Sequence, residues 1–428
     1  MNLGNRIYAV SDLRSNNEPV LIWPEEGLTR VPYAVYSDPD IYAAEQNSIF
    51  RGATWNYLAI TEEIPEPGDF KTTYVGENSV IVCRGRDGAI NAFVNRCSHR
   101  GSIVCMEDQG NAKVFTCPYH NWSFDLEGKL TGVAFRNGIK GEGGMPENFD
   151  PTKWGLEMLR IETYKNIIFG TFSSDVRPLH DYLGPVMRTH LDRLFNGRKM
   201  KVIGRYSQYL RNNWKLVMEN VRDTYHASIL HLFFGSFGLN RLSMEGGALT
   251  DETGWHHISY SKRATDDITG TEYENDALPS MKGNLQLADP MLLEQWEEVG
   301  DGITNTVQTI FPTVVFQQIT NSLGIRQLVP RGPEECELFW TLYGYDDDTE
   351  NQTNIRVKQG NLIGPAGLVS LEDGVICDFV QRAARVKSDA MPASIVEMGG
   401  HEVASSKTRA TETTVRGFWQ GYRDTMGV

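Results

Sequence analysis

Apolar and polar residues alternate over short distances in the first part of the chain, from about residue 47 to residue 174. Turn-forming pairs such as Asp87-Gly88 and Glu127-Gly128 interrupt the alternation. Short alternating segments with frequent turns are typical of antiparallel strands. We therefore predict a small all-β domain at residues 47–175. Its expected strands lie within residues 56–60, 69–75, 79–85, 90–97, 113–124 and 167–172.

The pattern changes after a proline-containing joint at residues 176–185. Mixed helical and β-rich segments then predict an α+β domain at residues 176–428, with helices and an antiparallel sheet. Residues 1–46 are expected to pack on this domain, and the polar stretch at residues 264–276 is expected to form a surface loop. The chain should end in a long helical tail. Helical periodicity covers residues 186–195 and 214–230, and β-rich segments cover residues 313–319, 322–330 and 336–345.

The composition narrows the classes of function. The 428 residues include 41 Lys and Arg against 55 Asp and Glu, a formal charge of -14, so a surface that binds nucleic-acid phosphates is not expected. No apolar run approaches the roughly 20 residues of a membrane-spanning helix. Polar residues such as Asn5 and Arg6 interrupt the N-terminus where a secretory signal needs an apolar core. We expect a soluble, cytoplasmic protein.

Two short motifs combine cysteine with histidine. The chain reads Cys97-Ser98-His99 and then Cys117-Pro118-Tyr119-His120, and its six cysteines are too few for a disulfide scaffold. Two thiolates and two imidazoles could hold zinc in tetrahedral geometry. However, each half supplies one cysteine and one histidine, whereas zinc fingers usually pair like with like. The order resembles the Rieske [2Fe-2S] motif, in which one iron takes two thiolates and the other two imidazoles.

The Rieske resemblance also indicates a subtype. In cytochrome bc-type Rieske proteins each ligand loop carries an extra cysteine, and these two cysteines form a disulfide. The matching positions here are Ser102 and Tyr119, which cannot form one. Fewer hydrogen bonds to the cluster sulfurs would lower the reduction potential, so the resemblance implies an oxygenase cluster rather than a respiratory one.

A second group of acidic residues and histidines follows the predicted helix that begins at residue 214. Glu219, Asp223 and His226 are spaced by four and three residues, so an uninterrupted helix would place them near one face. His231 comes five residues after His226, which puts it off that face. Both histidines can reach one metal only if the helix ends, bends or carries a π-bulge there. Two incidental histidines on a helix are the alternative.

Together with the first motif, this segment resembles the mononuclear iron motif of the Rieske non-heme iron oxygenases, the large subunits of aromatic ring-hydroxylating enzymes. The resemblance covers nearly the whole chain and implies a helix-grip catalytic domain. It implies that His226, His231 and a downstream carboxylate hold Fe(II), with positions left open for O2. The carboxylate at the family position is Asp373, and Glu372 and Asp378 are the alternatives.

The same resemblance implies an assembly and a route for electrons. Asp223 matches the aspartate that joins a Rieske histidine of one subunit to an iron-ligating histidine of the next, which implies a head-to-tail homotrimer. In many members a small β subunit completes an α3β3 hexamer. The chain has neither a Gly-rich dinucleotide motif nor an evident flavin site. NAD(P)H would therefore act through a separate reductase, with or without a ferredoxin.

Two arginines indicate the substrate. Arg326 lies in an apolar strand, where a guanidinium is costly unless it meets an anion, and Arg409 lies near the C-terminus. The alternative for Arg326 is an interior salt bridge, and the alternative for Arg409 is a charge on a surface helix.

Residues 317–318, residues 364–367 and the Arg409 segment resemble the aromatic-acid branch of the family, which includes terephthalate, anthranilate and ortho-halobenzoate dioxygenases and salicylate 5-hydroxylase. The resemblance implies that Arg326, Arg409 and Asn220 bind the substrate. It also implies ring hydroxylation of a substituted benzoate, by cis-dihydroxylation or by monohydroxylation. The other classes left open are an electron carrier with a Rieske cluster alone, a zinc-stabilised binding protein, a demethylase and a non-aromatic oxygenase.

Overall fold

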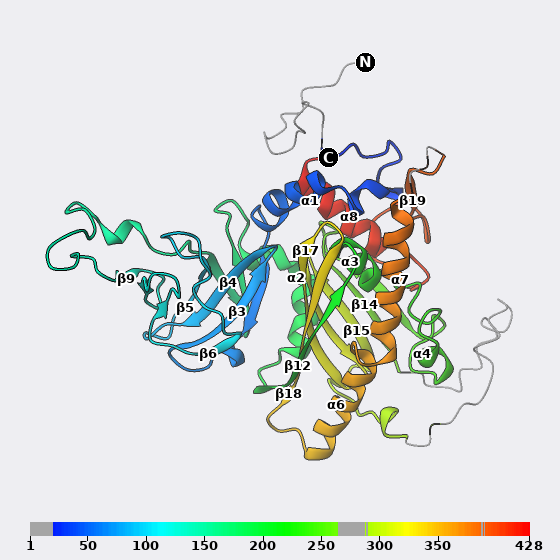
Figure 1. Ribbon diagram of the computed structural model, residues 1–428. Helices are drawn as coiled ribbons and strands as arrows, with labels where there is room; N and C mark the ends of the chain where they lie inside the picture. The colour runs from blue at the N-terminus through cyan, green and yellow to red at the C-terminus, as the bar shows by residue number, and fades with distance from the viewer. Residues whose placement is uncertain (1–19, 264–286, 288–289, 387, 389) are drawn as a thin grey trace. The chain divides into compact units, whose positions relative to one another are not determined.

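The computed structural model describes residues 20–263, 287, 290–386, 388 and 390–428 (Figure 1). The loop predicted at residues 264–276 lies outside the described residues. The chain divides into two compact units, Phe50–Leu179, here the smaller unit, and Met1–Ile49 with His180–Val428, here the larger unit. Helices and antiparallel sheets build the chain, which confirms the predicted α+β class.

The smaller unit consists of three antiparallel sheets with strand orders β5-β4-β3-β6, β10-β11-β2 and β7-β8-β9. Edge-to-face contacts of Phe115 with Phe70 and Phe93 join the first and third sheets in one core. The segment predicted as one β stretch at residues 113–124 is instead two short strands separated by a tight loop. The strands are β2 (Asn56–Ile60), β3 (Asp69–Val75), β4 (Asn78–Arg84), β5 (Ile90–Val94), β6 (Gln109–Asn111), β7 (Phe115–Thr116), β8 (Ser123–Phe124), β9 (Leu130–Gly132), β10 (Arg160–Tyr164) and β11 (Ile167–Thr171).

A seven-stranded antiparallel sheet organises the larger unit, in the order β12-β18-β17-β16-β15-β14-β13. Its central strands are buried on both faces, which explains their nearly continuous apolar sequence. A separate pair, β1 (Arg30–Pro32) and β19 (Ala393–Ile395), joins the two ends of the chain. The strands are β12 (Met200–Leu210), β13 (Gly246–Thr250), β14 (His257–Lys262), β15 (Ile303–Ile310), β16 (Val314–Ile319), β17 (Ser322–Gly332) and β18 (Glu335–Tyr345).

Helices pack along this sheet, and Figure 1 shows α6 and α7 following one another beside it. The helix predicted at residues 186–195 begins earlier, at Leu179, and has a kink at Gly184, where φ is 66°. The predicted C-terminal helical tail is interrupted, because β19 and irregular chain separate α7 from α8. The helices are α1 (Pro39–Glu45), α2 (Leu179–Leu194), α3 (Trp214–Arg222), α4 (Leu232–Ser236), α6 (Glu350–Ile363), α7 (Leu368–Ala384) and α8 (Thr413–Met426). None of the described helices is long and apolar enough to cross a membrane.

A buried ion pair attaches the N-terminal segment to the larger unit. Glu45 at the end of α1 accepts hydrogen bonds from Lys215 (2.6 Å) and Trp214 (2.8 Å) of α3 and from Tyr422 (2.7 Å) of α8. The Lys215 and Glu45 side chains have no exposed surface. Three donors compensate the buried carboxylate, so α1 is fixed beside the helix that leads into the histidine segment.

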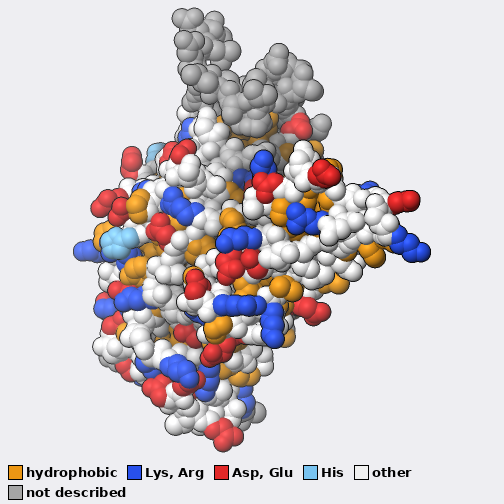
Figure 2. All heavy atoms as spheres, turned by 90° about the vertical axis from the view of Figure 1, so that its left-hand side faces the viewer, with side chains coloured by type: hydrophobic (Ala, Val, Ile, Leu, Met, Phe, Trp, Pro, Cys, Tyr) orange, Lys and Arg blue, Asp and Glu red, His pale blue; other side chains and the backbone are white. Residues whose placement is uncertain are grey.

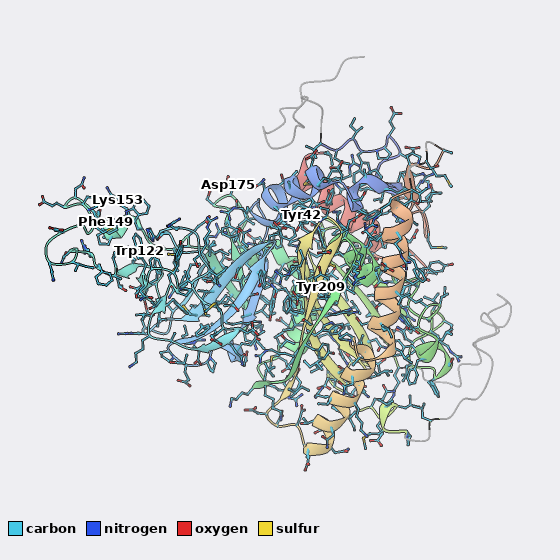
Figure 3. The ribbon with its side chains drawn as sticks, in the orientation of Figure 1. Tyr42, Trp122, Phe149, Lys153, Asp175 and Tyr209 are labelled. Atoms are coloured by element: carbon cyan, nitrogen blue, oxygen red, sulfur yellow. The ribbon has the colours of Figure 1, made fainter. Side chains whose placement is uncertain are left out.

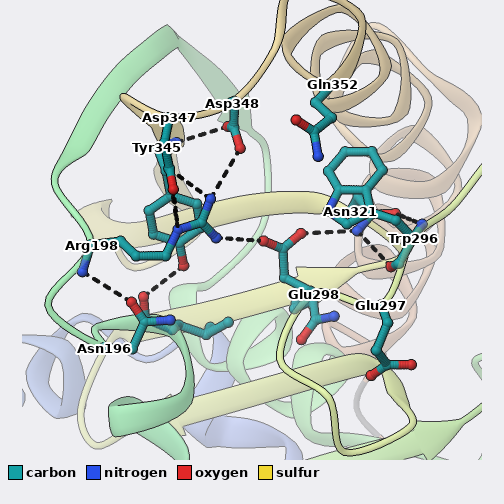
Figure 4. A network of polar contacts seen from close by, with 12 residues as sticks. Asn196, Arg198, Trp296, Glu297, Glu298, Asn321, Tyr345, Asp347, Asp348 and Gln352 are labelled. Atoms are coloured by element: carbon teal, nitrogen blue, oxygen red, sulfur yellow. Dashed lines mark hydrogen bonds and ion pairs between the residues drawn. The ribbon is translucent and has the colours of Figure 1, made fainter.

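A second buried network fixes the loop before β15 (Figure 4). Arg356 of α6 pairs with Glu298 at 2.9 Å and with Asp348 at 2.8 Å, and all three side chains are almost completely buried. Arg198 joins the same carboxylates from the partly exposed side. Loss of one partner would leave charge buried without compensation, so this network contributes strongly to local order.

On the face drawn in Figure 2, basic, acidic and apolar side chains are interspersed. No continuous basic area of the kind that binds phosphates is visible on that face.

Candidate functional site

Two similar loops carry the cysteine and histidine motifs of the smaller unit. In the first, the N–H of Cys97 donates to the carbonyl of Ser102 (2.8 Å), and the N–H of Gly101 donates to the carbonyl of Cys97 (2.9 Å). The second loop, residues 117–122, repeats both hydrogen bonds at equivalent positions. Gly101 has φ of 75°, a conformation that glycine adopts without strain. Because the two loops have the same geometry, each directs its Cys and its His side chain toward a common point.

The four side chains form two chemically different pairs. Cys97 and Cys117 are buried and interact through their sulfurs, whereas the His99 and His120 rings, 4.7 Å apart, lie nearer the surface. Burial raises the pKa of the Cys97 thiol, and the backbone N–H of His99 partly offsets this. One sulfur pair beside one imidazole pair matches a [2Fe-2S] cluster, whose irons take two thiolates and two imidazoles respectively. The residues present therefore fit that group.

In the larger unit, α3 ends just before the histidine segment. The helix begins after Asn213, whose side chain accepts from the N–H of Lys215, and it ends at Arg222. Asp223 leaves the helical conformation, and its carboxylate accepts the N–H of Tyr225 at 2.8 Å. This local turn competes with continued helix. The helix predicted to reach residue 230 is therefore wrong, and the predicted requirement that it end or bend is met.

The irregular chain after α3 brings the histidines together with a carboxylate from α7. His226 and His231 have ring centroids 5.2 Å apart, and Asp373 Oδ1 lies 3.6 Å from His226 Nε2 and 3.2 Å from His231 Nε2. Ligand atoms of all three lie within 4.8 Å of one another, and no other such group of His, Cys, Asp or Glu occurs among the described residues. Two imidazoles and one carboxylate are the donor set of a facial iron triad.

Electrostatics favours a cation at this point. Burial alone would lower the pKa of His226, but its interactions with Asp223 and Asp373 raise it to about 10. Burial alone would raise the pKa of Asp373, yet both histidines hold it below its ordinary value. The raised pKa of His226 favours its cation and the lowered pKa of Asp373 favours its anion. The carboxylates therefore favour a positive charge next to the imidazoles, which a mononuclear metal ion can supply.

Neighbouring carboxylates have different positions. Glu372 accepts from His231 Nδ1 at 2.8 Å, on the ring nitrogen opposite the one that faces Asp373. Asp378, the other alternative ligand, pairs with Arg382 near the surface. Glu219 does not share a helical face with the histidines, since α3 has ended. Its carboxylate accepts from Tyr36 and Trp419 instead.

A pocket in the larger unit opens beside the triad. Asn220 lines the pocket and donates to Asp373 Oδ1 at 3.2 Å. Asp223 also lines it, with its carboxylate 3.2 Å from His226 Nδ1. One part of the lining, here the apolar wall, suits an aromatic ring. The wall is formed by Val221, Phe234, Val307, Ile319, Ile363 and Val369.

Arg326 projects from β17 into this pocket. The residue is 6% exposed, and its guanidinium lies 5.0 Å from the ring centre of Trp340. Burial lowers the pKa of Arg326 to about 10, although the negative charge of Asp373 acts in the opposite direction and raises it. Among the described residues no carboxylate forms an ion pair with it, and its Nε has no hydrogen-bond partner there. The interior salt bridge considered as an alternative is therefore absent from the described part of the chain.

Arg409 lines the same pocket but is held by protein groups. Its Nη1 donates to the Asn240 side chain and its Nη2 to the carbonyl of Arg241. It is 2% exposed and precedes α8, so the alternative of a charge on a surface helix is wrong. Asn240, Ser261 and Asn305 also line the pocket but were not predicted, because isolated polar residues carry no spacing signal.

Two family models match the chain. A Rieske [2Fe-2S] domain matches residues 54–140, and the catalytic domain of the ring-hydroxylating alpha subunit matches residues 195–427. The chain is 47% identical to terephthalate 1,2-dioxygenase terminal oxygenase component subunit alpha 2 of Comamonas sp., over 96% of this chain and 98% of that one.

Two further relatives also cover most of the chain. It is 45% identical to the anthranilate 1,2-dioxygenase large subunit of Burkholderia cepacia, over 95% of each chain. It is 40% identical to the large oxygenase component of salicylate 5-hydroxylase from Ralstonia sp., over 95% of this chain and 96% of that one. The fold matches naphthalene 1,2-dioxygenase from Rhodococcus sp. with a TM-score of 0.77 at 23% identity, over 93% of this chain and 94% of that one.

Proposed function

The chain belongs to the family of ring-hydroxylating oxygenase alpha subunits, and from this premise we propose that it is the terminal oxygenase component that hydroxylates the ring of a substituted benzoate. The observation that carries the substrate class is the pocket itself. It places the buried guanidinium of Arg326 beside the donor group that includes Asp373. An aromatic acid supplies a ring for the apolar side chains of the pocket and a carboxylate for Arg326, which forms no ion pair among the described residues.

The family has two cofactors, a [2Fe-2S] cluster and a mononuclear iron, and electrons come from a separate reductase. We assign the cluster to Cys97, His99, Cys117 and His120, and the iron to His226, His231 and Asp373. When bound, the iron supplies O2 activation next to the ring, and the cluster supplies electrons one at a time.

The neighbours of the iron ligands fix their orientation. Glu372 holds Nδ1 of His231, which leaves Nε2 free to face the metal position. Asn220 donates to Asp373 and so keeps that carboxylate turned inward. Preorganised ligands lose little conformational freedom when the metal binds, so both neighbours should raise iron affinity.

Arg326 would bind the substrate carboxylate, and the apolar wall would hold the ring. A second carboxylate, as in terephthalate, could reach Arg409 only by displacing Asn240 or the Arg241 carbonyl. A benzoate with one carboxylate needs no such rearrangement. The product is a cis-dihydrodiol when both oxygen atoms enter the ring, and a phenol when one does.

The assembly is a further part of the proposal. We propose a head-to-tail homotrimer in which Asp223, next to His226, connects the iron to a Rieske histidine of another subunit, with or without a small β subunit. A ferredoxin could stand between reductase and cluster. The division into residues 1–46, 47–175 and 176–428 and the cytoplasmic location stay predictions of the sequence.

A product screen tests the proposal. The protein with both cofactors, a reductase and NADH would be offered anthranilate, salicylate, 2-chlorobenzoate and terephthalate, with benzene as the uncharged control. We expect ring hydroxylation of at least one acid and much slower reaction of benzene. Turnover of benzene at the rate of the acids would contradict an anionic substrate.

A further inference from the structure

A short loop of the smaller unit is attached to the first ligand loop. The hydroxyl of Ser98 donates to the carbonyl of Trp154 at 2.6 Å, and Ser98 lies between Cys97 and His99. The 3-10 helix η6 (Pro151–Lys153), with Asp150 as its N-cap, orients the chain that leads into Trp154. One hydrogen bond and a few covalent bonds therefore connect Trp154 with the cluster ligands.

An aromatic series follows the same direction. The ring of His99 stacks on Trp122 with centroids 4.5 Å apart and planes at 7°. Phe149 follows at 5.9 Å, and Trp154 stacks on Phe149 at 6.4 Å and 16°. Trp122 is 5% exposed, whereas Trp154 is 44% exposed. The series leads from the ring of His99 through the buried Trp122 to the exposed indole of Trp154.

Two basic side chains, Lys153 and Arg136, lie near Trp154, and the carboxylate of Asp150 lies near Lys153. The Lys153 side chain is 77% exposed, with only a long contact of 4.0 Å to Asp150. Arg136 lies over the ring of Phe149 and donates to its carbonyl. Figure 3 shows Trp122, Phe149 and Lys153 close together in the smaller unit.

The charge distribution between the units also favours this location. The smaller unit holds 14 of the 41 basic and 16 of the 55 acidic residues, so nearly all of the net negative charge lies on the larger unit. An acidic partner is repelled least by the smaller unit.

We propose that Trp154, Lys153 and Arg136 form the docking surface for an acidic iron-sulfur protein that reduces the cluster. The inference rests on the proposed function, because it requires a Rieske cluster that receives electrons from another protein. The donor loses one electron and the [2Fe-2S] cluster gains it, with no bond made or broken. The exposed edge of His99 and His120 stays available for electron transfer onward to the iron.

Stopped-flow reduction of the oxidised holoprotein tests this surface. The probe is a reduced plant-type [2Fe-2S] ferredoxin, an acidic protein, and methyl viologen radical serves as a small reductant that needs no docking. The variants are Trp154→Leu, Trp154→Phe and Lys153→Glu. Arg86→Glu is the matched charge control, because Arg86 is exposed in the turn before β5, at the opposite end of that strand from the ligand loop.

We expect Trp154→Leu and Lys153→Glu to slow reduction by ferredoxin at least tenfold, with Trp154→Phe and Arg86→Glu within twofold of wild type. Lys153→Glu should also weaken the decrease of the rate with added salt. Methyl viologen rates and the EPR spectrum of the reduced cluster should be unchanged in all variants.

Two results would overturn the proposal that these residues form the docking surface. One is reduction of Trp154→Leu and Lys153→Glu by ferredoxin at the wild-type rate. The other is equal slowing with methyl viologen, which would mean that the substitutions disturb the cluster. Wild-type protein without a Rieske EPR signal would instead overturn the proposed function, and this inference with it.

Discussion

The substitution Arg326→Met should raise the stability of the substrate-free protein and weaken substrate binding. Methionine matches the length of the arginine stem and can pack on Trp340 without a charge. Burial lowers the pKa of Arg326 to about 10 from its ordinary 12.5, so the folded protein carries a charge that is less favourable than in the unfolded chain. At 1.36 kcal/mol per unit, the difference is about 3 kcal/mol at neutral pH. Without substrate, the variant should therefore be more stable than wild type by up to about that amount.

The same change should weaken binding. A charge-assisted hydrogen bond contributes about 1.5–3 kcal/mol, which corresponds to a roughly 10- to 150-fold higher Kd for the benzoate. Substrate in excess over both Kd values should therefore stabilise wild type by about 1.5–3 kcal/mol more than the variant. Thermal and urea unfolding with and without substrate measure the first effect, and KM measures the second.

Two results would refute this reasoning. A substrate-free variant less stable than wild type would mean that Arg326 already has a compensating partner. An unchanged KM for every accepted acid would mean that the carboxylate binds elsewhere. Arg409→Met is the matched comparison, and it should lose stability because Asn240 and the Arg241 carbonyl lose their donor.

Asp223→Ala should lose turnover but keep both metals, as measured by iron analysis. An active and well-coupled variant would contradict the assigned electron route. Glu372→Gln should weaken iron binding about 10- to 100-fold, since His231 loses the charge on its Nδ1 partner, and equal affinity in a chelator titration would argue against that role. Arg356→Met should destabilise the fold by about 3–5 kcal/mol in urea, because two buried carboxylates lose their buried partner and keep only the partly exposed Arg198. Burial raises the pKa of Glu219 to about 7 from 4.5, so its proton stabilises the folded state below pH 4.5 and this contribution is lost as pH rises through 7. Glu219→Gln should remove this pH-dependent loss of stability, which is about 3 kcal/mol. Profiles of stability against pH that run parallel for wild type and variant between pH 5 and 8 would contradict this expectation.

Most strands of the smaller unit could be predicted because alternation and turn residues are local signals, although β6, β9 and β10 were missed. The order of Cys97, His99, Cys117 and His120 is also local, whereas the pairing of His226 with His231 rested on the family resemblance, since their spacing on a helix separates them. In the central sheet only β16, β17 and β18 were recognisable, because strands buried on both faces are apolar throughout.

Other features depend on contacts between distant segments. The segment after residue 222 has helical periodicity, but the side chain of Asp223 binds the next turn and ends the helix. Arg409 has charged and polar neighbours in sequence and yet is buried, because Asn240 and Arg241 contact it across 168–169 residues. Trp122 gave no sign of stacking on His99, since an aromatic residue near a ligand loop is equally consistent with a core position.

The most direct test of the account is a single turnover under ¹⁸O₂. The reduced holoprotein would be mixed with one accepted benzoate and labelled oxygen, and the product would be analysed by mass spectrometry. The account predicts a ring-hydroxylated acid that carries label from O2, formed by wild type and lost in His226→Ala. A cluster that is oxidised by O2 while the benzoate is recovered unchanged would contradict it.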